Sequence, residues 1–217
     1  MNSIEKLIQI FSRFPGIGPR QARRFVYYLL TRTDSAVEEL SQNIKDLKND
    51  VVICKECMRF FQKEHNKSGL CKICSDQNRD RSILMLVQRD VDLESVEKNG
   101  NFNGIYFVLG GGVAILEREP EKRIRIKELK SFIEKKLTHP NPSLKLREGQ
   151  GESYPMLKEI ILGVNWNPEG ENTGDYVEKF LKNYKVKISH LGKGLSMGSE
   201  LEYTDPDTLK NALKNRS

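Results

Sequence analysis

The sequence lacks any long hydrophobic run. Its 217 residues contain no stretch of 18 apolar residues, so we expect no membrane-spanning helix. The N-terminal segment MNSIEKLIQIFSRF is amphipathic and carries an acid, and it has neither the apolar centre nor the cleavage site of a signal peptide. The phosphate-binding patterns G-x-G-x-x-G and G-x-x-x-x-G-K-[ST] are missing as well. We therefore expect a cytoplasmic protein. Because both phosphate-binding patterns are missing, the sequence gives no support for a nucleotide-binding enzyme.

Acidic residues are missing from one part of a mildly basic chain. The net charge is +6 and the pI is about 9.0, which is a weak indication of nucleic-acid contact. Residues 11–32 contain no Asp or Glu but hold five arginines: Arg13, Arg20, Arg23, Arg24 and Arg32. Apolar side chains three and four residues apart predict one amphipathic helix before the PGIGP turn of this segment and another after it.

Gly16 and Gly18 lie in that turn, and a proline begins the second helix. Glycine permits a turn so tight that backbone N–H groups face outward, where they and the electropositive helix N-terminus can contact a phosphate. Arg20, Arg23 and Arg24 follow, off the apolar face of the helix. The pattern resembles the helix–hairpin–helix motif, which contacts the DNA backbone without reading base sequence. An ordinary helical hairpin with a solvated basic face is the alternative.

A third helix is predicted to follow, with Asp34 or Ser35 as its N-cap. Its apolar side chains recur at helical spacing, and we expect them on the inner face of the helix: Val37, Leu40, Ile44 and Leu47. The first 50 residues are therefore predicted to form a small helical unit.

Cysteine is scarce and confined to one segment. Cys54, Cys57, Cys71 and Cys74 form the pattern C-x2-C-x13-C-x2-C. Each pair lies on a tight turn whose sulfurs can reach one ion, and four thiolates close a tetrahedral zinc shell without a position for substrate. We therefore predict one structural zinc ion per chain; four free thiols or an iron site are the alternatives. His65 lies between the pairs and is expected to be a solvated loop residue rather than a ligand.

The second half of the chain alternates between strand and helix patterns. The apolar runs SILMLVQ, GIYFVLG, EIILGV and KVKISHL have strand length, and the helical patterns VDLESVEKN, IKELKSFIEKKL and DYVEKFLKNY separate them. This alternation predicts a parallel sheet with helices on its faces. Residues 138–153 hold two prolines and two glycines without periodicity, which predicts an exposed insertion. Asp205 followed by Pro206 predicts the start of a C-terminal helix.

The predicted strand ends lack the carboxylates of a catalytic site. In the Toprim domain of primases and topoisomerases, a glutamate after one strand and a D-x-D after a later strand hold magnesium. Here Gln88 follows the first strand, and Asn165 and Asn167 follow the third. Because magnesium favours anionic oxygen, we expect a Toprim-like fold without catalytic residues. The alternative is a magnesium-dependent nuclease or related phosphoryl-transfer enzyme that uses Glu169 and Glu171. Without such a role, these two glutamates are solvated acids of the loop.

Taken in order, these features closely resemble the RecR family of bacterial recombination mediators. The stretches FPGIGPRQARR, CKEC…CKIC, NGIYFVLGG, NPEGENT and GLSMGSELEYTDPDTL carry the resemblance and span almost the whole chain. It implies a non-catalytic DNA-repair protein that works with RecO and RecF to load RecA onto single-stranded DNA gaps. It also implies a homo-oligomer, a dimer or tetramer ring, that can encircle DNA.

The resemblance implies roles for individual residues as well. The hairpin, with Arg20, Arg23 and Arg24, is implied to bind DNA, and the four cysteines are implied to bind zinc. The Toprim region is implied to contact RecO. Because Gln88 replaces a glutamate that is common in the family, we expect Glu169 and Glu171 to carry more of that contact. A protein-only adaptor with a merely solvated basic face is a further alternative.

The sequence thus predicts an α/β protein of several modules. The expected parts are a helix–hairpin–helix DNA-binding region (1–53), a four-cysteine zinc finger (54–78), a Toprim-like parallel α/β domain (79–190) and a C-terminal oligomerisation tail with a helix (191–217).

Overall fold

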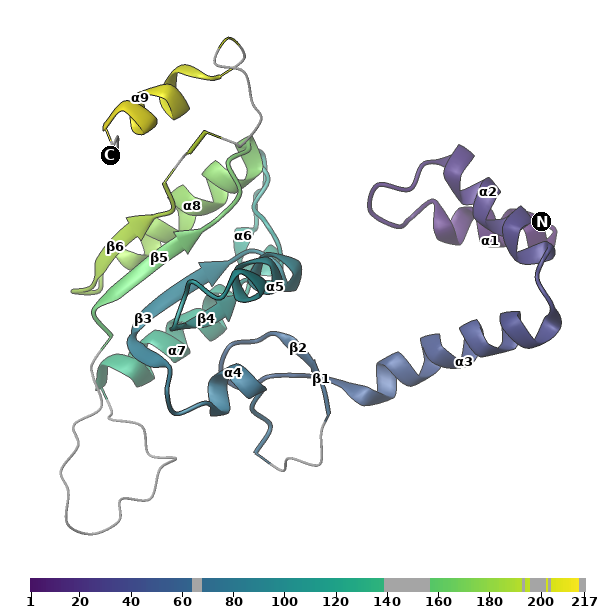
Figure 1. Cartoon of the computed structure of the whole chain (residues 1–217), viewed down its shortest axis with the longest axis horizontal. Helices are drawn as coiled ribbons and strands as arrows, with labels where there is room; N and C mark the ends of the chain where they lie inside the picture. The colour runs from purple at the N-terminus through teal and green to yellow at the C-terminus, as the bar shows by residue number, and fades with distance from the viewer. Residues whose placement is uncertain (64–67, 139–156, 193, 196–201, 203, 215–217) are drawn as a thin grey trace. The chain divides into compact units, whose positions relative to one another are not determined.

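The computed structural model describes residues 1–63, 68–138, 157–192, 194–195, 202 and 204–214 (Figure 1). The chain forms two compact units, Met1–Val52 and Ile53–Ser217. His65 and the predicted insertion after Thr138 lie outside the described residues. In the part of the chain that is described, no helix has the length and apolar character needed to cross a membrane.

Three helices make up the N-terminal unit: α1 (Ser3–Phe11), α2 (Pro19–Leu30) and α3 (Asp34–Asp50). α1 and α2 pack against each other through Phe11 and Phe25, whose rings meet edge to face at 6.1 Å, and Ala22 and Val26 of α2 are buried. This confirms the predicted pair of amphipathic helices. α3 differs from the prediction in two ways: Thr33 is its N-cap, and none of its residues is buried.

The second unit is built on a four-stranded parallel sheet. Its strands are β3 (Asp80–Val87), β4 (Gly104–Val108), β5 (Glu159–Gly163) and β6 (Lys187–His190), in the spatial order β4-β3-β5-β6. The intervening helices are α5 (Asp90–Asn99), α6 (Pro120–Arg123), α7 (Ile126–Thr138) and α8 (Pro168–Leu181). The predicted parallel sheet with helices between its strands is therefore confirmed.

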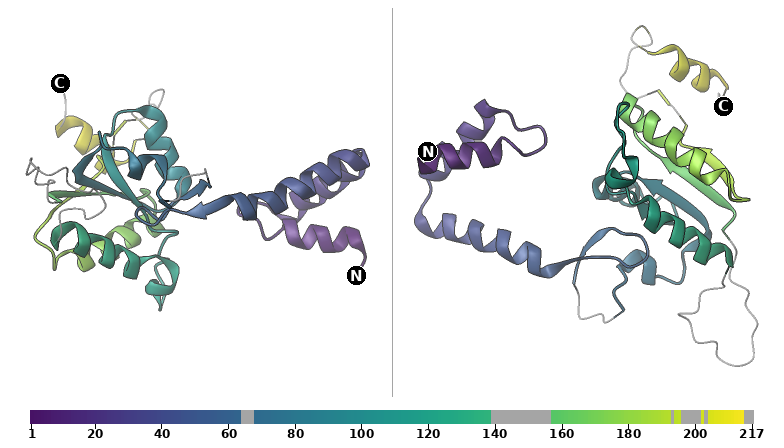
Figure 2. Two further views of the ribbon diagram at one scale, coloured as in Figure 1. Left: turned by 90° about the horizontal axis from the view of Figure 1, so that it is seen from below. Right: turned by 180° about the vertical axis from the view of Figure 1, so that it is seen from behind.

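The central strand β3 separates two hydrophobic clusters because its side chains alternate between the faces of the sheet. Leu84 and Leu86 join a cluster with buried side chains of α7 and α8. Met85 and Val87 join a second cluster with Leu93 of α5 and the four cysteines. Figure 2 shows the sheet between these helices. The cysteine segment is thus part of the core of this unit rather than a separate hydrophobic body.

The remaining elements flank this core. β1 (Val51–Ile53) and β2 (Phe60–Gln62) form a two-stranded sheet, and α4 (Lys72–Ser75) follows them. The C-terminal helix α9 (Pro206–Lys214) begins where the sequence predicts it. The Asp205 side chain accepts a hydrogen bond from the Thr208 N–H at 2.9 Å, as an N-cap residue does.

Candidate metal centre and nucleic-acid interface

The four cysteines are brought together by two turns of the backbone. In the turn between β1 and β2, the Cys54 N–H donates to the Arg59 carbonyl at 2.9 Å, and the Met58 N–H donates to the Cys54 carbonyl at 3.1 Å. The second turn begins α4, where the Cys71 carbonyl accepts from the Ser75 N–H at 3.0 Å. Met58 has a φ of 61°, in the left-handed region that costs a non-glycine residue about 1 kcal/mol. The local backbone is therefore strained at the first cysteine turn.

The sulfur atoms lie close enough to share one ion. All four Sγ atoms are within 4.8 Å of one another, and those of Cys57 and Cys71 are 3.6 Å apart. Zinc–thiolate bonds of about 2.3 Å in a tetrahedron place the sulfurs about 3.8 Å apart, so the arrangement fits this geometry. All four side chains are buried. The cluster can therefore hold a metal ion in a shell that four thiolates fill.

Hydrogen bonds among the thiols divide them into acidic and weakly acidic members. The bond from Cys57 lowers the pKa of Cys54, and burial opposes this effect. For Cys71, the bond to Cys54 raises the pKa, but the bonds from Cys57 and Cys74 lower it to about 7. The bond to Cys54 raises the pKa of Cys57, and the same partner raises that of Cys74. The cluster thus favours thiolate at two positions, and thiolate is the form that binds metal.

One side of the cysteine cluster is fastened to the sheet through the backbone. The Val108 N–H of β4 donates to the Cys57 carbonyl at 2.8 Å. The Arg125 guanidinium donates to the carbonyls of Met58 and Val108 and so joins the first cysteine turn to the same strand. The bonds to Cys57 and Met58 satisfy carbonyl groups that the tight turn leaves without helix or sheet partners.

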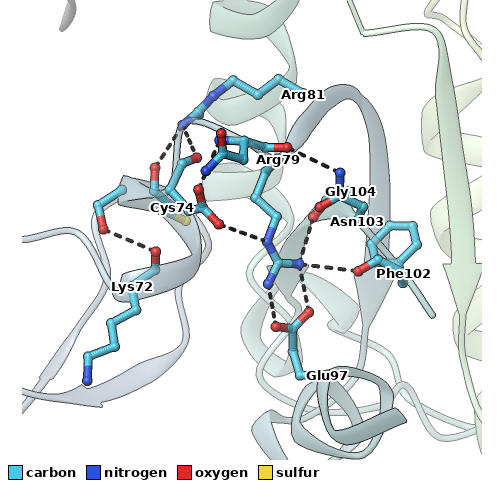
Figure 3. Close-up of polar contacts among 11 residues, drawn as sticks. Lys72, Cys74, Arg79, Arg81, Glu97, Phe102, Asn103 and Gly104 are labelled. Carbon is cyan, nitrogen blue, oxygen red and sulfur yellow. Dashed lines mark hydrogen bonds and ion pairs between the residues drawn. The ribbon is translucent and has the colours of Figure 1, made fainter. Parts of the chain in front are cut away.

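Two arginines at the start of β3, one just before the strand and one within it, make the other attachment (Figure 3). Arg81 donates to the Cys74 carbonyl at 3.0 Å. Arg79 forms a two-point ion pair with Glu97 of α5, at 2.8 and 2.5 Å, and also donates to the Gly104 carbonyl at 3.4 Å. The hydrogen bond from Arg79 lowers the pKa of the Glu97 carboxyl. The cysteine turns, the sheet and α5 are therefore linked by charge-assisted hydrogen bonds.

The glycine turn of the N-terminal unit leaves backbone donors exposed. Gly16 has a φ of +74°, which glycine adopts without strain, and Gly18 is the N-cap of α2. In this fully described unit, no protein acceptor is found for the backbone N–H groups of Gly16, Gly18, Arg20 and Gln21. Free N–H groups at a helix start attract phosphate. The predicted hairpin geometry is thus present, and it can accept an anion.

Three arginines extend from this turn along one face of α2. Arg20, Arg23 and Arg24 are exposed, and they line an open groove together with neighbouring side chains of the same helix: Pro19, Tyr27, Tyr28 and Thr31. None of the three pairs with a carboxylate among the described residues. Guanidinium groups without internal partners are available to phosphate oxygens. The structure therefore gathers the predicted DNA-contacting residues on one surface.

At the carboxyl ends of β3 and β5, neutral side chains bond to one another where a Toprim enzyme holds magnesium. Gln88 is buried; its Oε1 accepts from the Asn165 N–H at 3.1 Å, and its Nε2 donates to Thr173 Oγ1 at 3.5 Å. Thr173 Oγ1 donates to the Glu169 carbonyl at 2.6 Å and accepts from the Val113 N–H at 2.8 Å. The polar atoms of Gln88 are thus engaged by protein groups.

The two glutamates that follow are exposed near the start of α8. The Asn167 side chain caps this helix by accepting from the Gly170 N–H at 2.7 Å, so it is occupied by a structural bond. A Cβ atom on Gly112 would lie 2.5 Å from Glu169 Oε1 and 2.8 Å from Gln88 Nε2. The Glu169 carboxylate therefore lies beside the buried amide, whereas Glu171 is one of the exposed acids of the same helical turn.

Comparison with known proteins adds the family. The family described as "RecR, helix-hairpin-helix" matches residues 4–48, and "RecR, C-terminal" matches residues 194–217. The Recombination protein RecR of Chlorobium luteolum is 35% identical over 216 residues, covering 100% of this chain and 97% of its own length. Those of Lactobacillus helveticus and Rickettsia massiliae are each 33% identical and cover 99% of this chain, with 96% and 95% of their own lengths aligned.

This chain belongs to the RecR family. The aligned region covers the hairpin, the cysteine turns and the carboxyl ends of the strands. The family resemblance inferred from the sequence is confirmed. Which residues contact DNA, metal and partner proteins in this chain stays a prediction.

Sequence reasoning missed three groups of residues at these RecR-type features. Thr173 is reached only through contacts 60 and 85 residues away in sequence, to Val113 and Gln88. Arg81 and Arg125 fasten the cysteine turns through side-chain contacts that follow no periodic pattern. The exposed tyrosines beside the arginines had a sequence signal, because they continue the stripe of α2 at helical spacing.

Proposed function

We propose that this RecR-family protein is a non-catalytic, DNA-binding mediator of recombinational repair. It acts in the cytoplasm with RecO and RecF and helps to load RecA onto single-stranded DNA gaps. The observation that carries the proposal is the arginine surface on α2, which lies beside the open N–H groups of the glycine turn and has no internal carboxylate partner among the described residues. Such a surface supplies backbone contact without base-edge readout.

The sheet edge supports a role without catalysis. Asn165 and Asn167 carry neutral amides, so neither position presents a carboxylate to magnesium. The Asn167 side chain is in addition engaged as the cap of α8. Glu169 and Glu171 are exposed at this edge. We propose that they contact a partner protein, RecO in the first instance, rather than a reacting phosphate. Magnesium-dependent DNA cleavage that disappears in Glu169→Gln would instead establish the enzyme hypothesis.

The proposed metal is zinc, one ion per chain, held by Cys54, Cys57, Cys71 and Cys74. The sulfur spacing and the burial of all four side chains support this assignment. Bound there, the ion has no open coordination position and contributes to folding rather than to chemistry. Freshly purified, reduced protein that contains no zinc would contradict the assignment.

The proposed assembly is a ring-like homo-oligomer. Val37, Leu40, Ile44 and Leu47 recur along α3 and remain 38–60% exposed. The prediction that they face inward is wrong for the isolated chain, because no other element of the N-terminal unit covers them. An apolar stripe of this spacing on a helix is typical of a surface that packs against another chain. We propose that α3 and the C-terminal tail supply the contacts between subunits.

The test of the DNA-binding assignment reverses charge on the helix. We expect Arg23→Glu combined with Arg24→Glu to weaken binding to short DNA about 100-fold or more at moderate salt, because two attractive phosphate contacts become repulsive. Binding is measured by fluorescence anisotropy over a salt series, with the double variant Lys182→Glu and Lys185→Glu, at two exposed positions of the second unit, as the charge-matched control. Light scattering with and without DNA reports the oligomer. Unchanged affinity in the double variant would remove the hairpin assignment.

A further inference from the structure

Two exposed aromatic rings lie among the arginines of α2. Tyr27 and Tyr28 are 54% and 55% exposed, and they line the same groove as Arg20, Arg23 and Arg24. Phosphate binding alone needs no aromatic side chain, because guanidinium groups and backbone N–H groups supply the contacts. The rings therefore point to a second kind of contact on this surface.

Tyr27 occupies the middle of the arginine stripe. It follows Arg23 by four residues and Arg24 by three, so it lies one helical turn beyond both of them on the same face. The buried side chains of α2, Ala22 and Val26, belong to the other side of the helix. No aromatic or cation–π contact of Tyr27 is found within the described part of the chain. Its ring is therefore free for a ligand.

Tyr28 is in a different situation. The Arg32 guanidinium lies over its ring, 4.0 Å from the centroid, so a cation covers part of this ring. The stack also holds Arg32 at the far end of the stripe that begins with Arg20. Tyr28 therefore holds the Arg32 guanidinium in place, whereas the ring of Tyr27 remains available to contact a ligand.

Resting on the proposed DNA-binding role of the arginines, we propose that Tyr27 stacks on an unpaired base and gives this surface a preference for single-stranded DNA. An aromatic ring can stack on any base whose face is free, whatever its identity. In duplex DNA the base faces are covered by neighbouring pairs, whereas the phosphates stay accessible. The arginines bind both forms, and the ring distinguishes them.

The positive charge of residues 11–32 favours DNA, rather than a second copy of the chain, as the partner that binds the arginine surface of α2. Residues 11–32 contain five arginines and no acid. A symmetric contact would place the same surface on both subunits, and guanidinium groups would then face one another. A polyanion neutralises the same groups.

The experiment compares two variants on three ligands. Tyr27→Leu removes the ring and keeps an apolar side chain, and Tyr27→Phe is the matched control that keeps the ring. The ligands are a labelled oligothymidylate, an abasic deoxyribose-phosphate chain of equal length and a duplex, titrated by anisotropy at one salt concentration. We expect Tyr27→Leu to weaken oligothymidylate binding about 5- to 150-fold, the range of one lost base–aromatic stack. Its binding to the other two ligands stays within about 2-fold, and Tyr27→Phe binds all three like the parent.

Each contrary result has a distinct meaning. Equal loss on all three ligands, or no loss on any, overturns the stacking assignment. A fall in the light-scattering mass of Tyr27→Leu also overturns it, because the ring would then belong to a contact between copies. If the double arginine variant retains its affinity for all three ligands, the proposed DNA-binding function fails instead. If that variant loses all three while Tyr27→Leu changes nothing, the function stands and only the role of Tyr27 is rejected.

Discussion

In the N-terminal unit only Ala22 and Val26 are buried hydrophobic residues, whereas the unit Ile53–Ser217 contains two hydrophobic clusters. The arginines of the two units also differ in how far they are engaged by other groups of the protein. Arg23 and Arg24 have no internal partner among the described residues, but Arg79 and Arg81 are tied to Glu97 and to backbone carbonyls. The second unit thus engages Arg79 and Arg81 internally, whereas the first leaves the arginines of α2 exposed to ligands.

This contrast assigns different jobs to similar side chains. An arginine such as Arg81, which donates to the carbonyls of Cys74 and Asp76, holds a cysteine turn in place and is not free to meet a phosphate. An arginine on an open helix face contributes almost nothing to folding but is free to bind. Binding in this protein is therefore expected to depend on the least stable part of the chain.

The largest effect should come from breaking the metal cluster. Replacing one ligand by Cys71→Ser leaves three thiolates in a buried tetrahedral site, and we expect loss of the bound zinc and a drop of more than about 4 kcal/mol in the free energy of unfolding of the second unit. Metal content by mass spectrometry and urea unfolding followed by the fluorescence of Trp166 measure both changes. The control is Ile73→Val, a buried neighbour that is not a ligand; it should keep its zinc and lose about 1 kcal/mol.

Cys71→Ser also tests the contrast between the units. The α1–α2 hairpin belongs to the first compact unit and the cysteine turns belong to the second, so the helical signal of the hairpin should survive when the second unit unfolds. A single transition in which both units melt together, in the variant as in the parent, would contradict their independence.

A smaller effect on stability is expected when a carboxylate replaces the buried amide at the carboxyl ends of β3 and β5. Gln88→Glu removes the donor to Thr173 and places a negative charge beside Glu169. We expect a loss of about 1–3 kcal/mol in the free energy of unfolding, part of which magnesium restores because two carboxylates then converge. Trp166 is the single tryptophan and lies in the adjoining loop, so its fluorescence reports the change directly.

The exposed Gln62→Glu substitution is the matched control for this experiment, since it adds the same charge where no buried bond is lost. It should leave stability within about 0.5 kcal/mol and show no response to magnesium. If Gln88→Glu behaves in the same way, the hydrogen bonds of the buried amide do not stabilise these strand ends, and the amide is not what prevents magnesium from binding there.

Much of this arrangement is predictable from sequence because its signals are local. The glycine spacing predicts the hairpin, the two C-x2-C pairs predict the cluster, and alternating strand and helix patterns predict the parallel sheet. The predictions end where contacts are distant in sequence: Gln88 meets Thr173 across 85 residues, and Arg125 reaches Met58 across 67. The inner face predicted for α3 was wrong for a related reason, since periodicity identifies an apolar stripe but not the chain that covers it.

The smallest expected effect is a difference in stability between alanine substitutions at the two glycines of the hairpin. Neither would bring a Cβ atom within 4 Å of another group, so sterics do not distinguish them. Their backbones do: Gly16 has a φ of +74°, and Gly18 has a φ of −82°. We expect Gly16→Ala to destabilise the N-terminal unit by about 1 kcal/mol, because alanine is strained in the left-handed region. Gly18→Ala should cost less, about 0.5 kcal/mol, because alanine adopts this extended backbone without strain and loses only the preference for glycine over alanine at an N-cap.

Thermal unfolding followed by circular dichroism measures this difference, with DNA affinity measured in parallel. If the turn presents its N–H groups to phosphate, Gly16→Ala also weakens DNA binding, about 3-fold or more, while Gly18→Ala binds nearly as the parent does. Equal behaviour of the two variants in both measurements would mean that the left-handed residue is not what shapes the turn. The arginines of α2 would then bind DNA without help from the hairpin backbone.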